Sequence, residues 1–298
     1  MNLARNVFAV LLGATLALAP VSPAWARPAV GPGHKGPLVA AADLLNRLKL
    51  TAAQKTRIFA VLGQHKNEIV AVGGAKVEAH AQLQDAIQAA NPDPAAIKKA
   101  AATLAEADLK AAQLRARIHP QIMAILTPKQ KLEVLAVMAH ARGWMGGPGH
   151  EGIGGPGKGA GMGKGMGKGP GHMLGRILDF AGEHADLTAQ QRDQIKGVVE
   201  GRKTQLMSLH KAQMDAEKAL RTALHQPTPP SEKAIRRAAA DVARARLDFA
   251  LERAQIHARA AKVLTPAQRT QLESLRTDMQ GVRLEQAHAI LTLVRELL

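Results

Sequence analysis

The sequence predicts an all-α protein of two tandem helical-hairpin modules, and the first observation behind this prediction is a repeated five-residue motif. The motif Leu-Thr-x-x-Gln occurs at 50–54, 126–130, 187–191 and 264–268. Thr followed three residues later by Gln is a capping box, in which each side chain bonds the backbone N–H of the other residue. Each motif therefore predicts the start of a helix. The residues expected to cap these helices are Thr51, Gln54, Thr127, Gln130, Thr188, Gln191, Thr265 and Gln268.

The second observation is the spacing of the motifs, which indicates one module used twice. The first two motifs lie 76 residues apart and the last two 77 residues apart. Between the motifs of each pair, apolar residues recur every seven positions and the two sets match at an offset of 138. Spacing of this kind describes one face of a helix. The matched sets are Ile97, Leu104, Ala111, Ile118 and Ile125 in the first module and Ile235, Val242, Phe249, Ile256 and Val263 in the second.

The elements of the first module follow in order from these signals. We expect a short lead-in helix at 38–48, a long helix from the first motif to a proline turn at 91–94, a second helix reaching the second motif, and a third helix ending at Gly143. Gly73 and Gly74 predict a kink in the long helix of this module only.

The second module repeats the same order. Its lead-in helix is expected at 174–187, its proline turn at 226–230 and the end of its third helix at Gly281. No segment of the chain has the pattern of a strand.

The N-terminus and the segments between the modules complete the organisation. Residues 1–26 have the features of a secretory signal, a positive start, an apolar run and a small-x-small cleavage site after Ala26, which predicts that the mature protein is exported. The other segments are the first module at 27–142, a flexible linker rich in Gly, Met, Lys and His at 143–173, the second module at 174–281 and an amphipathic C-terminal helix at 282–298.

Composition limits the classes of function. The chain has no Cys, so it has neither disulfides nor thiolate metal sites, and its formal net charge is +16. Abundant Ala favours thin, elongated helical layers over a thick core. Strong positive charge suits acidic clients or an acidic membrane surface. Export and an aromatic content of 2% argue against nucleic-acid binding. No catalytic constellation or phosphate loop is present, so we expect no enzyme.

The paired motifs, the predicted signal and the Cys-free helical pattern resemble the Spy/CpxP family of periplasmic LTxxQ-motif proteins. The resemblance covers about 40–142 and 175–281. It implies an antiparallel helical hairpin that dimerises into a shallow cradle, and an ATP-independent chaperone that holds unfolded clients during envelope stress. Other members restrain an envelope-stress sensor kinase, and one branch binds metal. Because this chain carries two modules, we expect a monomeric pseudo-dimer within one chain, with a homodimer as the alternative.

A client-binding face is expected on the second helix of each module, off the apolar stripe. Basic residues beside apolar ones would attract and weakly hold partly unfolded proteins, although charged residues on one helix face are more often only solvated. The candidates are Leu109, Lys110, Arg115 and Arg117 in the first module and Arg244, Arg246, Leu247 and Arg253 in the second.

Metal binding is the alternative function. Imidazole and thioether groups are ligands for zinc or copper, and the linker contains both. The candidates are His150, Met162, Met166, His172 and Met173. A plain flexible linker explains the same Gly-rich composition, so no cofactor is required.

Overall fold

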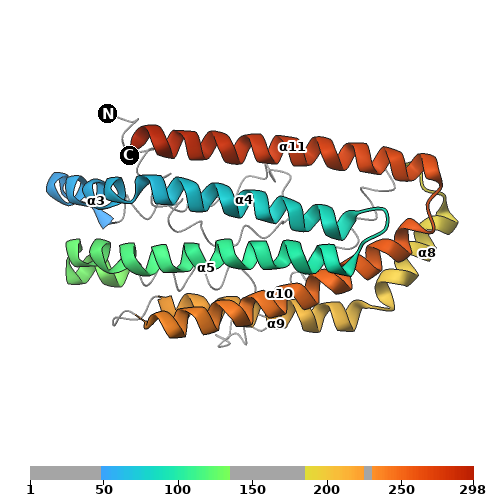
Figure 1. The fold of residues 1–298 in the computed structure, drawn as a ribbon, viewed down its shortest axis with the longest axis horizontal. Helices are drawn as coiled ribbons and strands as arrows, with labels where there is room; N and C mark the ends of the chain where they lie inside the picture. The colour runs from blue at the N-terminus through green and yellow to red at the C-terminus, as the bar shows by residue number, and fades with distance from the viewer. Residues whose placement is uncertain (1–47, 135–184, 225–229) are drawn as a thin grey trace, which may run out of the picture. The chain divides into compact units, whose positions relative to one another are not determined.

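The computed structural model describes residues 48–134, 185–224 and 230–298, and the regular structure in these segments is helical throughout. The predicted all-α fold class is therefore confirmed. None of the helices in these segments combines the length and the apolarity that crossing a membrane requires. In chain order the helices are α3 (Ala52–Gln64), α4 (Lys66–Gln88), α5 (Pro94–Ile125), α8 (Ala189–Glu200), α9 (Lys203–Leu224), α10 (Glu232–Ala261) and α11 (Pro266–Leu297) (Figure 1).

The chain divides into two compact units. Unit 1 comprises Met1–Gln64 and Pro120–Gly167, and unit 2 comprises His65–His119 and Lys168–Leu298. Unit 2 thus holds α4, α8 to α11 and α5 as far as His119. This division follows contacts in space, whereas the predicted modules follow the repeat in the sequence.

All four predicted capping boxes are present. In the first motif the backbone N–H of Gln54 donates to Thr51 Oγ1 at 3.2 Å, and the N–H of Thr51 donates to Gln54 Oε1 at 3.0 Å. The other three motifs repeat both bonds. In the second and fourth motifs a proline occupies the first helical position, where its missing N–H costs nothing.

The same glutamines also join the motifs in pairs. In unit 1, Gln54 Nε2 donates to Gln130 Oε1 at 2.8 Å, and Gln130 Nε2 donates back to Gln54 Oε1 at 3.2 Å. In unit 2, Gln191 and Gln268 form the same reciprocal pair at 2.9 and 3.1 Å. Each of the four also donates to a backbone carbonyl. The motif is thus a helix start and one half of a clasp between two helix starts.

The long helix of each predicted module is interrupted at a place that the sequence did not indicate. The interruption lies at His65 between α3 and α4, and at Gly201 and Arg202 between α8 and α9. α4 runs through Gly73 and Gly74, where a kink was predicted, without a break in the helix. The two modules therefore share an interruption, which the sequence comparison did not show.

The second helices begin and end as predicted. α5 starts after Asp93, whose carboxylate accepts from the N–H groups of Ala95 and Ala96, and α10 starts after Ser231, whose hydroxyl accepts from that of Ala234. Side-chain acceptors at this position satisfy N–H groups that have no partner inside the helix.

The third helix of the second module is longer than predicted. α11 continues through Gly281, the expected end, to Leu297, so the separate C-terminal helix at 282–298 is the last part of α11. A Cβ at Gly281 would meet nothing within 4 Å, so no packing demands a break there.

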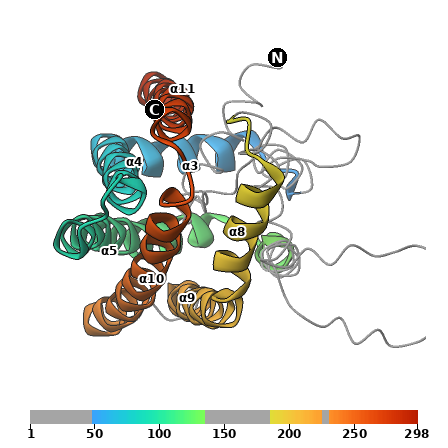
Figure 2. The same cartoon turned by 90° about the vertical axis from the view of Figure 1, so that its right-hand side faces the viewer.

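α11 lies along α4 in the opposite direction. Arg276 Nη1 donates to the carbonyl of Gln88, and Gln280 Nε2 donates to Asp85, both at 3.1 Å. Further along, Leu291 lies over Gly73. In both views α4 lies between α11 and α5 (Figures 1 and 2). Gly73 therefore allows a close approach between two helices.

The two adjacent glycines of α4 should respond differently to alanine. A Cβ at Gly74 would lie 3.9 Å from Leu291 Cδ1, an ordinary contact, so Gly74→Ala should raise the free energy of unfolding by about 0.5–1 kcal/mol through helix propensity. A Cβ at Gly73 would lie 2.7 Å from Leu291 Cδ2, so Gly73→Ala should gain less because Leu291 must move. Thermal denaturation of both variants measures this difference. Equal gains would show that Gly73 does not set the helix approach.

The predicted apolar stripes form the core. Ile97, Leu104, Ala111, Ile118 and Ile125 are all buried. In the second module Ile235, Val242 and Ile256 are buried, whereas Phe249 and Val263 are half-buried.

The predicted signal at 1–26, the lead-in segment 38–47, the linker at 143–173 and most of the lead-in at 174–187 lie outside the described residues. The same holds for the predicted helix end at Gly143 and for most of the turn at 226–230.

Candidate functional site

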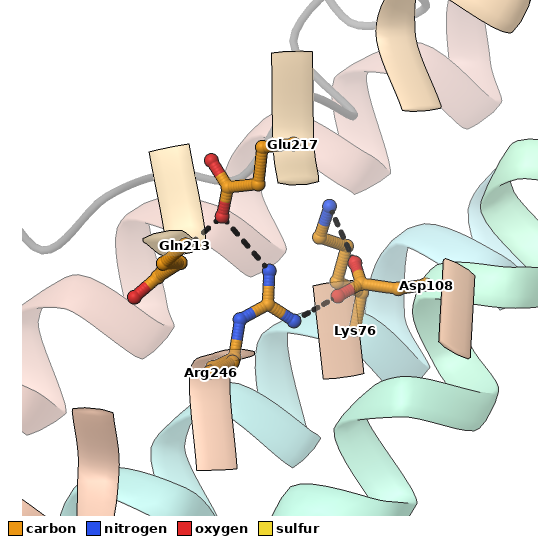
Figure 3. A network of polar contacts seen from close by, with 5 residues as sticks. All are labelled: Lys76, Asp108, Gln213, Glu217 and Arg246. Carbon is orange, nitrogen blue, oxygen red and sulfur yellow. Dashed lines mark hydrogen bonds and ion pairs between the residues drawn. The ribbon is translucent and has the colours of Figure 1, made fainter. Parts of the chain in front are cut away.

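A network of buried charges joins four helices of unit 2. Lys76 of α4 contacts Asp108 of α5, with 2.9 Å between Nζ and Oδ1. The other carboxylate oxygen of Asp108 pairs with Arg246 of α10, and Arg246 Nη2 lies 3.3 Å from Glu217 Oε1 of α9. Gln213 Nε2 donates to the same Glu217 oxygen at 3.0 Å (Figure 3). Two positive and two negative groups alternate, so the network is internally neutral.

Burial sets the electrostatics of this network. Burial lowers the pKa of Lys76 from its ordinary value, and Asp108 opposes this by stabilising the ammonium. Burial alone would raise the pKa of Asp108, but Lys76 and Arg246 outweigh it and hold that pKa below its usual value. The side chain of Arg246 is 12% exposed and that of Glu217 5%. Charges so placed require their partners, because an unpaired buried charge is very costly.

Two further arginines, Arg253 and Arg115, lie half-buried beside the network. Arg253 donates to Gln84 Oε1 at 3.3 Å, and its guanidinium lies 5.8 Å from the centre of the Phe249 ring. Burial, followed by repulsion from Arg221, lowers the pKa of Arg115 to about 10, and its Nε atom is buried without a hydrogen-bond partner. These residues are structural parts of the bundle.

Five of the eight residues predicted for a client-binding face on α5 and α10 are half-buried between helices. Leu109 packs with α9 and α10, and Leu247 packs with α4 and α5. Arg115, Arg246 and Arg253 are the other three, with the contacts given above. The periodicity of one helix identifies its most apolar face, whereas only the neighbouring helices decide how much of the remaining surface is covered.

The other three predicted residues are exposed. Lys110 pairs with Glu106 at 2.8 Å on the same helix, and Arg117 pairs with Glu68 of α4. Arg244 lies on the outer side of α10. These three residues contribute to a basic surface. Leu109 and Leu247, the apolar residues predicted for the same face, are half-buried and not exposed beside them.

An exposed apolar face is present on α11 instead. Val282, Ile290 and Leu293 are 52%, 42% and 41% exposed. Spacings of eight and three residues place them on one side of the helix. Leu291 faces Gly73 and Val294 is fully buried, so the opposite side of the same segment is docked on α4. The sequence predicts an amphipathic helix for the whole segment, and the structure separates a docked side from an open one.

The titration of His80 offers a test of the packing around the network. Burial first, and then Arg246, Arg253 and Lys76, lower the pKa of His80 to about 4, with Asp108 acting in the opposite direction. The unfolded chain, in which His titrates near 6.5, therefore binds the proton more readily. The contribution of His80 to the free energy of unfolding should be fully present above pH 6.5 and should fall by about 3 kcal/mol as the pH approaches 4.

The His80→Gln variant should lose most of this dependence between pH 6.5 and 4. Urea denaturation at several pH values measures it, and His288→Gln, at an exposed position of α11, is the control. An unchanged slope in His80→Gln would show that His80 is not the group that titrates.

Metal-ligand geometry is absent from the described part of the chain. No group of three or more His, Asp or Glu side chains there is arranged to hold a metal ion. The predicted ligands His150, Met162, Met166, His172 and Met173 lie outside the described residues.

Comparison with known proteins gives one match. Residues 7–133 match a family described as heavy-metal resistance, which is related to the Spy/CpxP-like helical periplasmic proteins. The match covers less than half of the chain and ends before the His and Met candidates. No curated protein and no solved structure matches the chain.

Proposed function

We propose that this protein is a non-catalytic, ATP-independent chaperone of the periplasm that holds partly unfolded proteins on the outward face of α11. The observation that carries the proposal is the cluster of Val282, Ile290 and Leu293 on the open side of a helix whose other side is docked. Exposed apolar residues gathered on one face commonly mark a binding surface. An open surface of three separate side chains suits weak contact with many sequences better than one shaped ligand.

Charge supports the same function. The formal net charge of +16 attracts acidic or partly unfolded chains over a distance before contact. Exposed basic residues on α5 and α10 contribute to this field, among them Lys98, Lys99, Arg236, Arg237 and Arg244.

The holding activity is tested with reduced α-lactalbumin, an acidic protein that aggregates once its disulfides are broken. The chain has no Cys, so the reductant acts on the client alone. We expect the mature protein to suppress light scattering at stoichiometric amounts without ATP. An absence of suppression would contradict the proposal.

A matched pair of variants locates the surface. The triple variant Val282→Gln, Ile290→Gln and Leu293→Gln should lose most of the suppression. The control variant Ser274→Gln, Glu285→Gln and Thr292→Gln changes three exposed polar positions of the same helix and should keep it. Circular dichroism checks that both variants retain their helices. Full activity in the first variant would exclude this face.

Metal binding is the second candidate, favoured by the heavy-metal-resistance match. Titration calorimetry with Cu²⁺ and Zn²⁺ on the mature chain, compared with a chain lacking 143–173, tests it. Saturable binding that disappears with the deletion would support a site formed by the His and Met residues of that segment.

The proposal includes two tandem modules that pair within one chain as a pseudo-dimer. This part of the proposal is supported by the way in which residues of unit 2 that are related by the sequence offset pack against one another. Leu247, Ala250 and Ala254 of α10 pack against α4 and α5, and their counterparts at offset 138, Leu109, Ala112 and Ala116 of α5, pack with α9 and α10. The partners correspond as well, since Leu83, Ile87 and Ile97 in the first cluster match Leu220, Leu224 and Ile235 in the second. Reciprocal packing of this kind is the property of a two-fold interface.

A further inference from the structure

The buried network lies where a two-fold relation would bring residues onto their own counterparts. Asp108 and Arg246 pair directly, and they are 138 residues apart, the offset between the two modules. Lys76 and Gln213 of the network also correspond, at an offset of 137, and at the same offset Glu217 corresponds to His80, whose pKa is shifted by the charges of the network. The network and His80 therefore occupy three matched pairs of positions, with a different residue on each side.

The residues at these positions complement each other in charge. The first module contributes Lys76, His80 and Asp108, and the second contributes Gln213, Glu217 and Arg246. Where an identical pair would place two carboxylates or two guanidiniums in contact, the chain places one of each. Like charges in contact in a buried site repel each other strongly, and a buried ion without a partner costs several kcal/mol.

We infer that these six residues form a pairing code by which the first module accepts the second module as its partner and rejects a copy of itself. The partner surface that fits α4 and α5 is thus the α9–α10 face, held by the Asp108–Arg246 pair at its centre. The inference rests on the paired-module organisation proposed above and is independent of client holding.

Exposed positions near the network show the same charge complementarity between the modules. Glu106 and Lys110 also match residues of opposite charge, Arg244 and Asp248, at an offset of 138. These residues are exposed, and exposed ion pairs contribute little because water screens them. Only the buried positions can therefore discriminate between partners.

Three variants of the full-length mature chain test the code. In the first, Lys76→Gln, His80→Glu and Asp108→Arg give both modules the second set of residues. In the second, Gln213→Lys, Glu217→His and Arg246→Asp give both modules the first set. The third combines all six substitutions, so that the two sets exchange places. The control is Glu106→Arg with Lys110→Asp, which makes the exposed positions alike.

Urea denaturation followed by circular dichroism gives the result. Each three-residue variant should raise the unfolding equilibrium constant by about 100-fold or more, or fail to fold. The six-residue exchange should return to within about tenfold of the original chain, and the control should change it by less than about threefold. Two results would overturn the code: three-residue variants as stable as the original chain, or an exchange variant no more stable than they are, including one that does not fold.

Discussion

The Asp108→Ala variant is expected to lose about 3–5 kcal/mol of the free energy of unfolding. The substitution removes the one carboxylate that contacts both Lys76 and Arg246, at the junction of α4, α5 and α10. Lys76, which is buried, would then lose this counter-ion, and Arg246 would keep its pairing with Glu217. The cost comes from the charges left behind, and for this reason it exceeds that of losing a surface pair.

Urea denaturation of the mature chain measures this loss, and Glu106→Ala is the matched control. Glu106 lies two residues earlier on α5 and pairs with Lys110 on the same exposed face, so its removal should change the free energy of unfolding very little. Equal losses in the two variants would show that water already screens the network.

The second large effect is expected from Gln191→Glu in the clasp of unit 2. Gln191 Oε1 accepts from the N–H of Thr188 and from Gln268, while Gln191 Nε2 donates to the Val263 carbonyl and to Gln268 Oε1. These four bonds use the full capacity of one amide. A carboxylate has no donor, so its second oxygen would face two acceptors. We expect a loss of about 2–3 kcal/mol.

The neighbouring Gln190 supplies the control. It is exposed in the first turn of the same helix, where a negative charge is favourable, so Gln190→Glu should be neutral or slightly stabilising. Thermal denaturation of both variants separates the clasp from a general effect of charge. Gln54→Glu should repeat the loss in unit 1, because its bonds are the same. A Gln191→Glu variant as stable as Gln190→Glu would mean that the helix cap alone accounts for the motif.

The clasp geometry that both units share was not evident from a single motif. A capping box accounts for the Thr and for one oxygen of the Gln, and Asn or Glu would appear to be near substitutes. The remaining N–H groups find partners about 76 residues away, and only the folded chain shows which residues those are. The equal spacing of the motif pairs was the available signal, since two helix starts at a constant separation can be joined by the same contact.

The buried network was also not evident from the sequence. Lys76, Asp108, Glu217 and Arg246 each lie three or four residues from an apolar position of their own helix, at Val72, Leu104, Leu220 and Val242 respectively. Charged residues are nevertheless mostly exposed, so this spacing alone did not predict their burial. The module offset already related Asp108 to Arg246, but it did not indicate that a residue would meet its counterpart. The exposed face of α11 was likewise visible only as an amphipathic pattern, in which Leu291 and Val294 could not be told apart from Ile290 and Leu293.

From the sequence alone follow the all-α class, the four helix starts, the proline turn after α4 and the apolar stripes of α5 and α10. These features depend on contacts between residues a few positions apart, which the linear order determines. The tertiary structure decided which helix faces become covered, because coverage depends on neighbours that are distant in the chain. It partly covered Arg246 and Leu109, left Val282 and Leu293 open, and made Gly73 a contact point for α11.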